Sequence, residues 1–352
     1  MRALIETIDR RDPPVSLAPE PRTSRGALKR FLASTSFAYP ILRIPRVAHH
    51  DRLDSATCEW LTQCGIVRSE SQSHRLRITQ TGRLAALAYG YAEEPTVQLA
   101  SDLIAWSFLF DDYFAEGELR RSPAALTARV AELASVLRLE GAPSGAEPFA
   151  LALDQLFGRL ATHAPRDWME RFARGVRVYF EGCLRETRHR RAEETPSVAT
   201  YLDMRAQSIG VHPVLDFIEV AMGAFLPSAC VAHPSFARTQ RLANLVSALT
   251  NDIFSARKEA SEDSAYNVVS VVAVHEGLDT RAALLRSIQI HDEHLAELRA
   301  AQRELTAAID DLSVDRYFVG VYHWLQANYE WSAEVPRYDE ALPEDWEFIL
   351  SS

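Results

Sequence analysis

The sequence predicts an all-α protein with about ten or more helices, and three observations support this. Only 14 of the 352 residues are glycine, and alanine, leucine, arginine and glutamate are abundant, a balance that favours helices over sheets. From residue 51 onward, apolar residues recur at helical spacing almost without a break. No segment of useful length shows the period-two alternation of a strand, so helices joined by short loops are expected.

One division of the chain is predicted. Residues 1–26 are rich in proline, arginine and serine and show no periodicity, so we expect a mobile N-terminal tail. Residues 27–352 contain no further linker rich in proline, glycine or serine. They are therefore predicted to form a single α-helical domain.

Four helical segments are predicted in the first part of this domain. The first and the last of them end on glycine, a favourable C-terminal stop, and the third is long and strongly apolar. A Ser-Pro pair, typical of a cap followed by a first-turn proline, begins the fourth. The segments are residues 51–65, 81–92, 96–117 and 122–141.

Six further helical segments are predicted after residue 160. The first is long and amphipathic, and the second and third are separated by a break at Gly210 and Pro213. The remaining three follow with short connections between them. The segments are residues 165–191, 197–210, 212–225, 235–260, 279–311 and 313–332.

The composition argues against several classes of function. A net charge of −10 does not suit binding to nucleic acid across a broad surface. The four cysteines form no CxxC pair, and no histidine is spaced to complete a zinc site with them. No apolar run reaches the roughly 18–20 residues of a membrane span, and the start of the chain is unlike a signal peptide. We therefore expect a cytoplasmic protein without a nucleic-acid partner.

The segment "DDYFAE" places three acids at the end of a strongly apolar helix. Asp112 and Glu116 are four residues apart and share a helix face, while Asp111 lies about 100° round from Asp112. Burying such a cluster is costly unless a cation accompanies it. Mg²⁺ prefers oxygen ligands, so these acids are candidate magnesium ligands, with an acidic helix end in water as the alternative.

A second segment, "NDIFSARKE", carries hard oxygen donors at strict four-residue steps. Asn251, Ser255 and Glu259 fall on one helical stripe, and Lys258 stands beside them as a possible contact for an anion. The residues between and before them are largely apolar, which places this helix mostly in the core. The stripe is therefore expected to face a cavity, with a polar stripe on a surface helix as the alternative.

Together these two segments resemble the two metal-binding motifs of bacterial class I terpene synthases. In that family the first motif is DDxxD or a looser DDxxxD/E, and the second is NDxxSxxxE. The second matches here at every defining position and the first matches the loose form. The family also has an arginine about 46 residues before the asparagine, Arg205 here, and a C-terminal Arg-Tyr pair, Arg337 and Tyr338 here. The resemblance spans about residues 38–338.

The resemblance implies a single-domain class I terpenoid synthase fold around a central apolar cavity. It implies an enzyme that ionises and cyclises a linear isoprenoid diphosphate with three Mg²⁺ ions. Farnesyl diphosphate (C15) is the commonest substrate in the family, so a sesquiterpene product is expected. Ser107 and Val214 are small where relatives often have larger side chains, which leaves geranylgeranyl diphosphate (C20) and a cyclic diterpene as the alternative.

The resemblance also implies roles for individual residues. Asp111 would ligate metal directly, Asp112 would ligate metal or form a salt bridge, and the final acid, Glu116, is variable in the family. On the second helix the metal ligands would be Asn251, Ser255 and Glu259. The groups expected to hold the diphosphate are Arg205, Lys258, Arg337 and Tyr338.

Ser208 and Ile209 occupy the positions where the family has its linker residue and its effector, whose backbone carbonyl faces the substrate. Gly210 and Pro213 fit a helix break that would expose that carbonyl. An ordinary helix end is the alternative interpretation.

A carbocation intermediate requires a dry pocket, and aromatic faces stabilise positive charge within it. Phe108, one turn before the first acids, and Trp324 and Trp331 are the candidates. Trp331 is favoured because the family has an aromatic residue at that position. For Trp106 and Phe110, packing in the core is an equal alternative.

Two rival functions remain open at this stage. The segment Asp310–Asp315, "DDLSVD", also fits DDxxxD, and chain-elongating prenyl diphosphate synthases share the fold and carry two Asp-rich motifs. We favour a helix–helix turn there, with Ser313 as the cap of the next helix. A non-enzymatic helical binding protein would not need the four-residue steps of the second motif.

The expected assembly is a homodimer.

Overall fold

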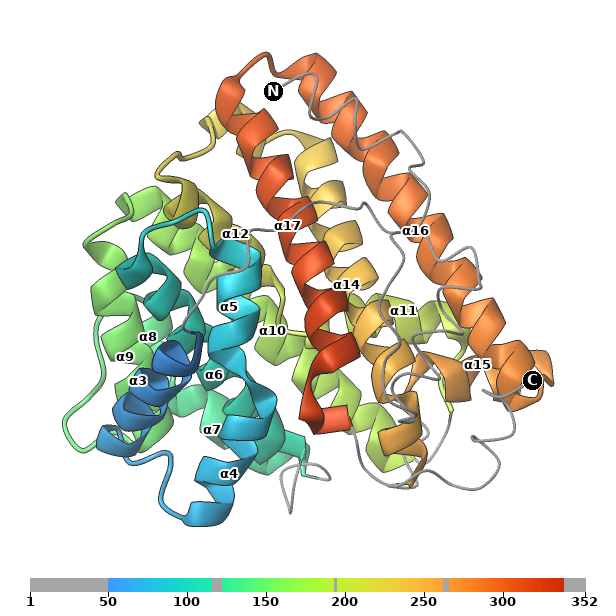
Figure 1. Ribbon diagram of the computed structural model, residues 1–352, viewed down its shortest axis with the longest axis horizontal. Helices are drawn as coiled ribbons and strands as arrows, with labels where there is room; N and C mark the ends of the chain where they lie inside the picture. The colour runs from blue at the N-terminus through green and yellow to red at the C-terminus, as the bar shows by residue number, and fades with distance from the viewer. Residues whose placement is uncertain (1–49, 116–121, 193–194, 262–265, 339–352) are drawn as a thin grey trace.

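The computed structural model describes residues 50–115, 122–192, 195–261 and 266–338 (Figure 1). Within these ranges the chain forms fifteen α-helices and one short 3₁₀ helix, and it contains no strand. The predicted all-α class is therefore confirmed. The predicted tail, residues 1–26, lies outside the described residues, and the domain boundaries stay predictions.

The helices before residue 162 gather in the left half of Figure 1. Helices α5 and α6 pack against each other, and α3 packs on both of them. These helices are α3 (His50–Gln63), α4 (Glu70–Thr79), α5 (Thr81–Tyr89), α6 (Glu94–Ala115), α7 (Pro123–Glu132), α8 (Ala134–Leu137) and α9 (Pro148–Ala161).

The later helices include the longest ones, and Figure 1 shows three of them, α14, α16 and α17, running together. Helix α11 packs against both α10 and α14, while α12 packs against α10 and α17. These elements are α10 (Arg166–Ala192), α11 (Val198–Ser208), α12 (His212–Met222), α13 (Ser228–Val231), α14 (Pro234–Ser261), α15 (Val268–Glu276), α16 (Thr280–Ala308), α17 (Leu312–Glu334) and the 3₁₀ helix η2 (Pro336–Tyr338).

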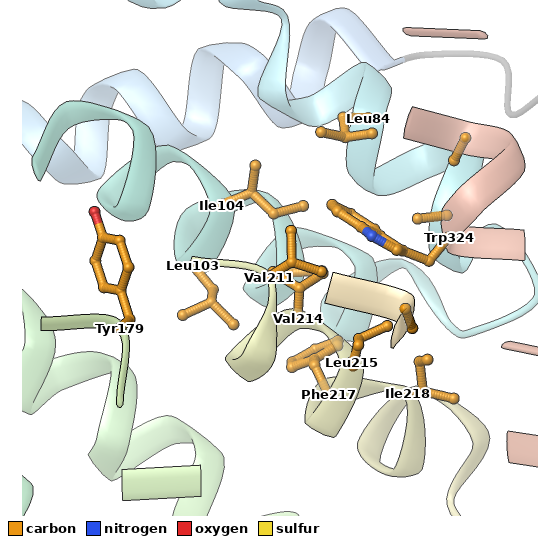
Figure 2. Packing of buried hydrophobic residues seen from close by; sticks show 14 of the residues in the cluster. Leu84, Leu103, Ile104, Tyr179, Val211, Val214, Leu215, Phe217, Ile218 and Trp324 are labelled. Carbon is orange, nitrogen blue, oxygen red and sulfur yellow. The ribbon is translucent and has the colours of Figure 1, made fainter. Parts of the chain in front are cut away.

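Apolar side chains from helices that are distant in the sequence meet in the interior. Figure 2 shows Ile104 of α6, Val214 of α12 and Trp324 of α17 close to one another, and all three are buried. Removing each such side chain from water contributes about 1.5–3 kcal/mol to stability. This packing fixes α6, α12 and α17 relative to one another, and two of these helices lead directly to the predicted site.

The predicted break between two helices is confirmed. Helix α11 ends at Ser208, α12 begins at His212, and Pro213 lies in the first turn of α12. Gly210 lies between them with φ +75°, a left-handed conformation that glycine adopts without steric cost. The chain can therefore turn sharply at this point, beyond the last turn of α11, which carries Arg205.

Two details of the predicted helix ends are wrong. The segment predicted as one helix over residues 122–141 is divided at Leu133 into α7 and α8, although Ser122 caps its start as expected. Helix α17 is capped by Asp311, whose side chain accepts a hydrogen bond from the Ser313 backbone N–H, and not by Ser313. Aspartate competes well with serine for this role because its carboxylate also suits the helix dipole.

No helix among the described residues combines the length and the apolar character that crossing a membrane would require.

Candidate active site

The two adjacent aspartates lie at the C-terminal end of α6, with Phe108 one turn earlier. Asp111, Asp112 and Phe108 are each partly exposed, while the intervening residues 109–110 are buried. This pattern indicates that one face of the end of α6 borders a hollow. Glu116, the third acid of the motif, lies outside the described residues.

Asp112 is held by a bidentate ion pair with Arg337 of η2. The Arg337 Nη1 and Nη2 atoms donate to the two carboxylate oxygens at 3.1 Å and 2.5 Å, and Nη1 also donates to Thr79 Oγ1 at 3.2 Å. Burial by itself raises the pKa of Asp112, but Arg337, with help from Arg75 and Lys258, brings the pKa below its usual value. Asp112 is therefore ionised, and it joins the end of α6 to η2.

Arg205 connects the end of α11 to α14. Its Nε donates to Asp252 Oδ1 and its Nη2 donates to Asn251 Oδ1, both at 3.0 Å. Asn251 in turn donates to the Tyr338 hydroxyl at 2.8 Å, and the Tyr201 hydroxyl donates to Asp252 Oδ2 at 2.6 Å. Through Asn251, three separated segments of the chain meet: α11, α14 and η2.

The oxygen donors of the second motif form one stripe along α14. Asn251, Ser255 and Glu259 succeed each other at one-turn intervals, as predicted. Asn267, which caps α15, donates through Nδ2 to Glu259 Oε2 at 3.0 Å and lies 3.5 Å from Ser255 Oγ. The same amide group donates to the Asp252 carbonyl at 2.8 Å, so α15 holds the stripe in position from one side.

Two carboxyl groups of the site have strongly raised pKa values. Burial, followed by the charges of Asp112 and Glu186, raises the pKa of Asp111 to about 6. Burial, followed by the charge of Asp252, raises the pKa of Glu259 to about 7. Nearby arginine opposes both shifts without cancelling them. A cation bound between these groups would favour their ionised forms.

The side chains at this site suit a hard divalent cation. Carboxylate, amide and hydroxyl oxygens are the ligands that Mg²⁺ prefers, and it usually retains waters and binds substrate phosphates as well. Within the described part of the chain, no three histidine, cysteine, aspartate or glutamate side chains cluster closely enough to hold a metal by themselves. The candidate ligand set accordingly includes an amide, Asn251, and a hydroxyl, Ser255, together with acids from two helices.

Aromatic rings line the same end of the molecule. The Phe108 and Trp331 ring centroids are 5.4 Å apart, and Trp331 lies edge-on to Tyr338 at 5.8 Å. The Trp331 indole Nε1 donates to the Thr79 carbonyl at 2.8 Å, which fixes the orientation of the ring. The Arg337 guanidinium lies 5.2 Å from the Phe108 ring centroid, so this ring already faces a cation.

The other predicted site residues lie nearby or deeper in the fold. Trp324 is two turns before Trp331, and its indole donates to Ser247 Oγ at 3.0 Å in the buried interior. The Ser208 hydroxyl is buried with no hydrogen-bond partner among the described residues, and Ile209 follows it at the partly exposed helix break.

Trp106 and Phe110 serve as packing. Their rings stack with centroids 5.3 Å apart, and the Trp106 indole donates to the Phe149 carbonyl at 3.0 Å. Both residues are buried between α6, α9 and α10, on the side of α6 away from Phe108.

Comparison with known proteins assigns this arrangement to a family. A family model described as "Terpene synthase family 2, C-terminal metal binding" matches residues 102–297, more than half of the chain. The chain belongs to the terpene synthase family. This terpene synthase is 33% identical over 286 residues to 10-epi-cubebol synthase of Sorangium cellulosum, which covers 80% of this chain and 90% of that protein. It is therefore a metal-dependent lyase that acts on an isoprenoid diphosphate.

A second relative agrees with this assignment, and a solved structure shares the fold. The synthase is 32% identical to a (+)-T-muurolol synthase of Roseiflexus castenholzii described as "(2E,6E)-farnesyl diphosphate cyclizing", over 82% of this chain and 89% of that one. The crystal structure of 2-methylisoborneol synthase from Streptomyces coelicolor, in complex with Mg²⁺ and 2-fluoroneryl diphosphate, has the same fold. Its TM-score is 0.78 at 22% identity, over 86% of this chain and 97% of that one.

Several residues of the site were not predicted from the sequence. Asp252 stands inside the second motif and carries the ion pair with Arg205, yet it does not fall on the stripe of oxygen donors. Asn267 precedes a run of valines and has the sequence signature of a helix cap, which gave no hint of its bond to Glu259. Thr79 and Glu186 reach the site from α4 and α10 and had no sequence signal.

The raised pKa values predict how pH and Mg²⁺ act together on stability. The folded protein holds protons on Asp111 and Glu259 at a pH where the unfolded chain has lost them, so without metal these two groups reduce stability as pH rises from about 4 to about 7. Mg²⁺ competes with those protons. The increase in melting temperature on adding Mg²⁺ should therefore be larger at pH 8 than at pH 5.5, and a hundredfold excess over Kd corresponds to about 2.7 kcal/mol.

Asp54 on α3 supplies the control for this experiment. Its pKa is also raised to about 6 by burial, but it lies on α3 and bonds the Gly82 backbone N–H. Asp54→Asn should change the pH dependence of the melting temperature while leaving the Mg²⁺-induced increase intact. An equal Mg²⁺ effect at both pH values would show that Asp111 and Glu259 do not bind the ion.

Proposed function

We propose that this terpene synthase ionises and cyclises farnesyl diphosphate to a sesquiterpene. The observation that supports this most directly is the convergence of four segments, α6, α11, α14 and η2, through the bonds of Asp112 with Arg337 and of Asn251 with Arg205 and Tyr338. Acidic oxygen donors and cationic hydrogen-bond donors thereby meet beside partly exposed apolar residues. The name of the Roseiflexus relative, a farnesyl diphosphate cyclase, supports the C15 substrate.

In this proposal the diphosphate group is held by donors from three elements. Arg205 and Arg337 each carry five N–H groups in a planar fork, which matches the oxygens of a phosphate. Tyr338, which bonds Asn251, and Lys258, whose charge acts on Asp112, would add a hydroxyl and an ammonium group. When bound, divalent cations supply the positive charge that stabilises the departing diphosphate. We propose that three Mg²⁺ ions bind at this site.

The remainder of the substrate would lie against the apolar and aromatic residues. Phe108 is partly exposed near the diphosphate end with the buried Trp331 ring packed against it, and Trp324 lies deeper, near Val214 (Figure 2). Ring faces stabilise a developing carbocation, and a dry interior keeps water from trapping it early. The unpartnered Ser208 hydroxyl and the Ile209 backbone at the helix break are proposed to face the same intermediate.

The homodimer and the cytoplasmic location stay predictions.

The test is to incubate the protein with Mg²⁺ and with the C10, C15 and C20 diphosphates separately, followed by gas chromatography and measurement of released diphosphate. We expect a cyclic C15 product from farnesyl diphosphate. A cyclic product formed from the C20 diphosphate, and not from farnesyl diphosphate, would show that the C20 compound is the substrate. No diphosphate release from any of the three would contradict the proposed activity.

The position of the second aspartate-rich segment argues against a chain-elongating enzyme. Asp311 caps the start of α17, whereas Trp331 and the adjoining η2 lie at its other end. A helix of 23 residues is about 35 Å long, so Asp310 and Asp315 lie far from the stripe on α14 that bonds η2. Asp310 and Asp311 lie in the turn between α16 and α17, as favoured from the sequence, and the rest of the segment forms the first turn of α17.

Trp331→Phe tests the predicted role of the aromatic rings in directing cyclisation. The substitution keeps an aromatic ring beside Phe108 but removes the indole bond to the Thr79 carbonyl, so the ring is free to reorient. The product mixture should change, with turnover kept within about tenfold, which corresponds to about 1.4 kcal/mol. Trp168→Phe is the matched control, since Trp168 is equally buried but packs on Phe172 and Phe225. An unchanged mixture in Trp331→Phe would remove this ring from the set that contacts the intermediate.

A further inference from the structure

One glycine of α10 lies directly against the backbone at the end of α11. A Cβ atom added to Gly182 would lie 2.6 Å from the Ser208 backbone nitrogen and 2.7 Å from the Gln207 carbonyl carbon. It would also lie 2.8 Å from Gln207 Cβ. Two of these three atoms belong to the backbone, so no side-chain rotation can make room. Only glycine at this position lets α10 approach α11 so closely.

The same face of α10 also contacts the other side of the helix break. Tyr179 precedes Gly182 by three residues and therefore lies on the same face of the helix. Its ring packs on Gly210, where an added Cβ would lie 3.2 Å from the nearest ring carbon. The break between α11 and α12 is thus supported on both sides, by Gly182 at residues 207–208 and by Tyr179 at Gly210.

We propose that Gly182 is a positioning residue of the diphosphate site, acting through the end of α11. The proposal rests on the proposed role of Arg205 in binding diphosphate. Arg205 stands one turn before Ser208, and the Ile209 N–H donates to its carbonyl oxygen at 3.2 Å. The position of this helix end therefore determines where the guanidinium lies relative to α14.

The geometry leaves little tolerance for movement of that helix end. Non-bonded carbon atoms pack at about 3.5–4.0 Å, so a methyl group at Gly182 would push the two helices apart by roughly 1 Å. The two hydrogen bonds from Arg205 to Asn251 and Asp252 are 3.0 Å long, and a shift of that size would break them. A displacement of about 1 Å at a reacting site can lower the rate about a hundredfold.

The test compares Gly182→Ala with Gly158→Ala. Gly158 is also inside a helix, α9, but an added Cβ there meets no atom within 4 Å, so this variant should match the wild type. Both variants are first checked for folding by circular dichroism and melting temperature, and are then assayed well below that temperature. Gly182→Ala should lower kcat about 10- to 100-fold, change the product ratio and weaken binding of inorganic diphosphate in the presence of Mg²⁺.

The outcomes separate this proposal from the proposed function. If the wild-type protein showed no catalysis, the proposed function itself would be contradicted. An active wild type, together with a folded Gly182→Ala variant of unchanged diphosphate affinity and product ratio, would overturn the positioning role. If Gly182→Ala does not fold, Tyr179→Leu decides, because it removes the ring from Gly210 without adding bulk at α11. A changed product ratio in that variant supports the proposal, and an unchanged ratio overturns it.

Discussion

Replacement of Asn251 or Glu259 by alanine is expected to abolish turnover. Each variant removes one oxygen donor from the stripe on α14, where hard oxygen ligands are needed to hold a divalent cation against the leaving group. Loss of about 4 kcal/mol of charge stabilisation lowers kcat about a thousandfold. The measurement is steady-state release of diphosphate from the C15 substrate at saturating Mg²⁺.

The Glu259→Ala variant should lose activity without losing its fold. The pKa of Glu259 is raised to about 7 because of burial, so its ionised form disfavours the folded state without metal above that pH. Removing it should leave the melting temperature of the metal-free protein at pH 8 unchanged or higher. Glu304→Ala, at an exposed glutamate on α16, is the control and should keep full activity. Substantial activity in both Asn251→Ala and Glu259→Ala would contradict the metal assignment.

Arg205→Lys is expected to lower kcat/KM by roughly 30- to 160-fold. The Arg205 fork bonds Asn251 and Asp252 at the same time, and a single ammonium group cannot reproduce both bonds in this geometry. Loss of one hydrogen bond to a charged group costs about 2–3 kcal/mol, which corresponds to that factor. Asp252 is only 1% exposed, so the variant should also be less stable, as measured by urea unfolding.

The chain offers a matched control for this arginine. Arg241 also links α14 to α11, through Asp203 at 3.2 Å, but the two side chains are about half exposed, at 50% and 44%. Exposed ion pairs contribute at most about 1 kcal/mol, so Arg241→Lys should change neither activity nor stability appreciably. Equal behaviour of the two lysine variants would show that Arg205 has no special part in the site.

The sequence predicted most of the long helices and the residues that carry the chemistry. The four-residue steps from Asn251 to Glu259 require only local helical geometry, and the structure keeps that stripe. The same holds for the break at Gly210, which follows from local backbone preference. Features that depend on residues within two or three turns of one another could be read directly from the chain.

Besides the single-turn helix α13, three helices escaped prediction because their sequences carry weak local signals. Helix α4 is polar along most of its length, and α15 has only nine residues with successive valines, which suit a strand as well as a helix. Helix α9 follows a loop that contains two glycines and a proline, and its start is marked only by Pro148. In each case tertiary packing decides the structure, and packing has no local pattern in the sequence.

The bonds that assemble the site could not be predicted for a related reason. Asp112 meets Arg337 across 225 residues, and Trp331 meets Thr79 across 252. No spacing rule connects such partners, since their encounter depends on how all the intervening helices pack. For the same reason the sequence identified Asp112 and Arg337 separately and left open which partner each would bind.

These long-range bonds have a consequence for the order of events during folding. Contacts between residues far apart in the sequence form late, because the intervening chain must first be ordered at a cost in loop-closure entropy. The helices can therefore exist before Thr79, Asp112 and Asn251 have met their partners on α17 and η2. During denaturant titration, catalysis should accordingly disappear at a lower urea concentration than helical circular dichroism does.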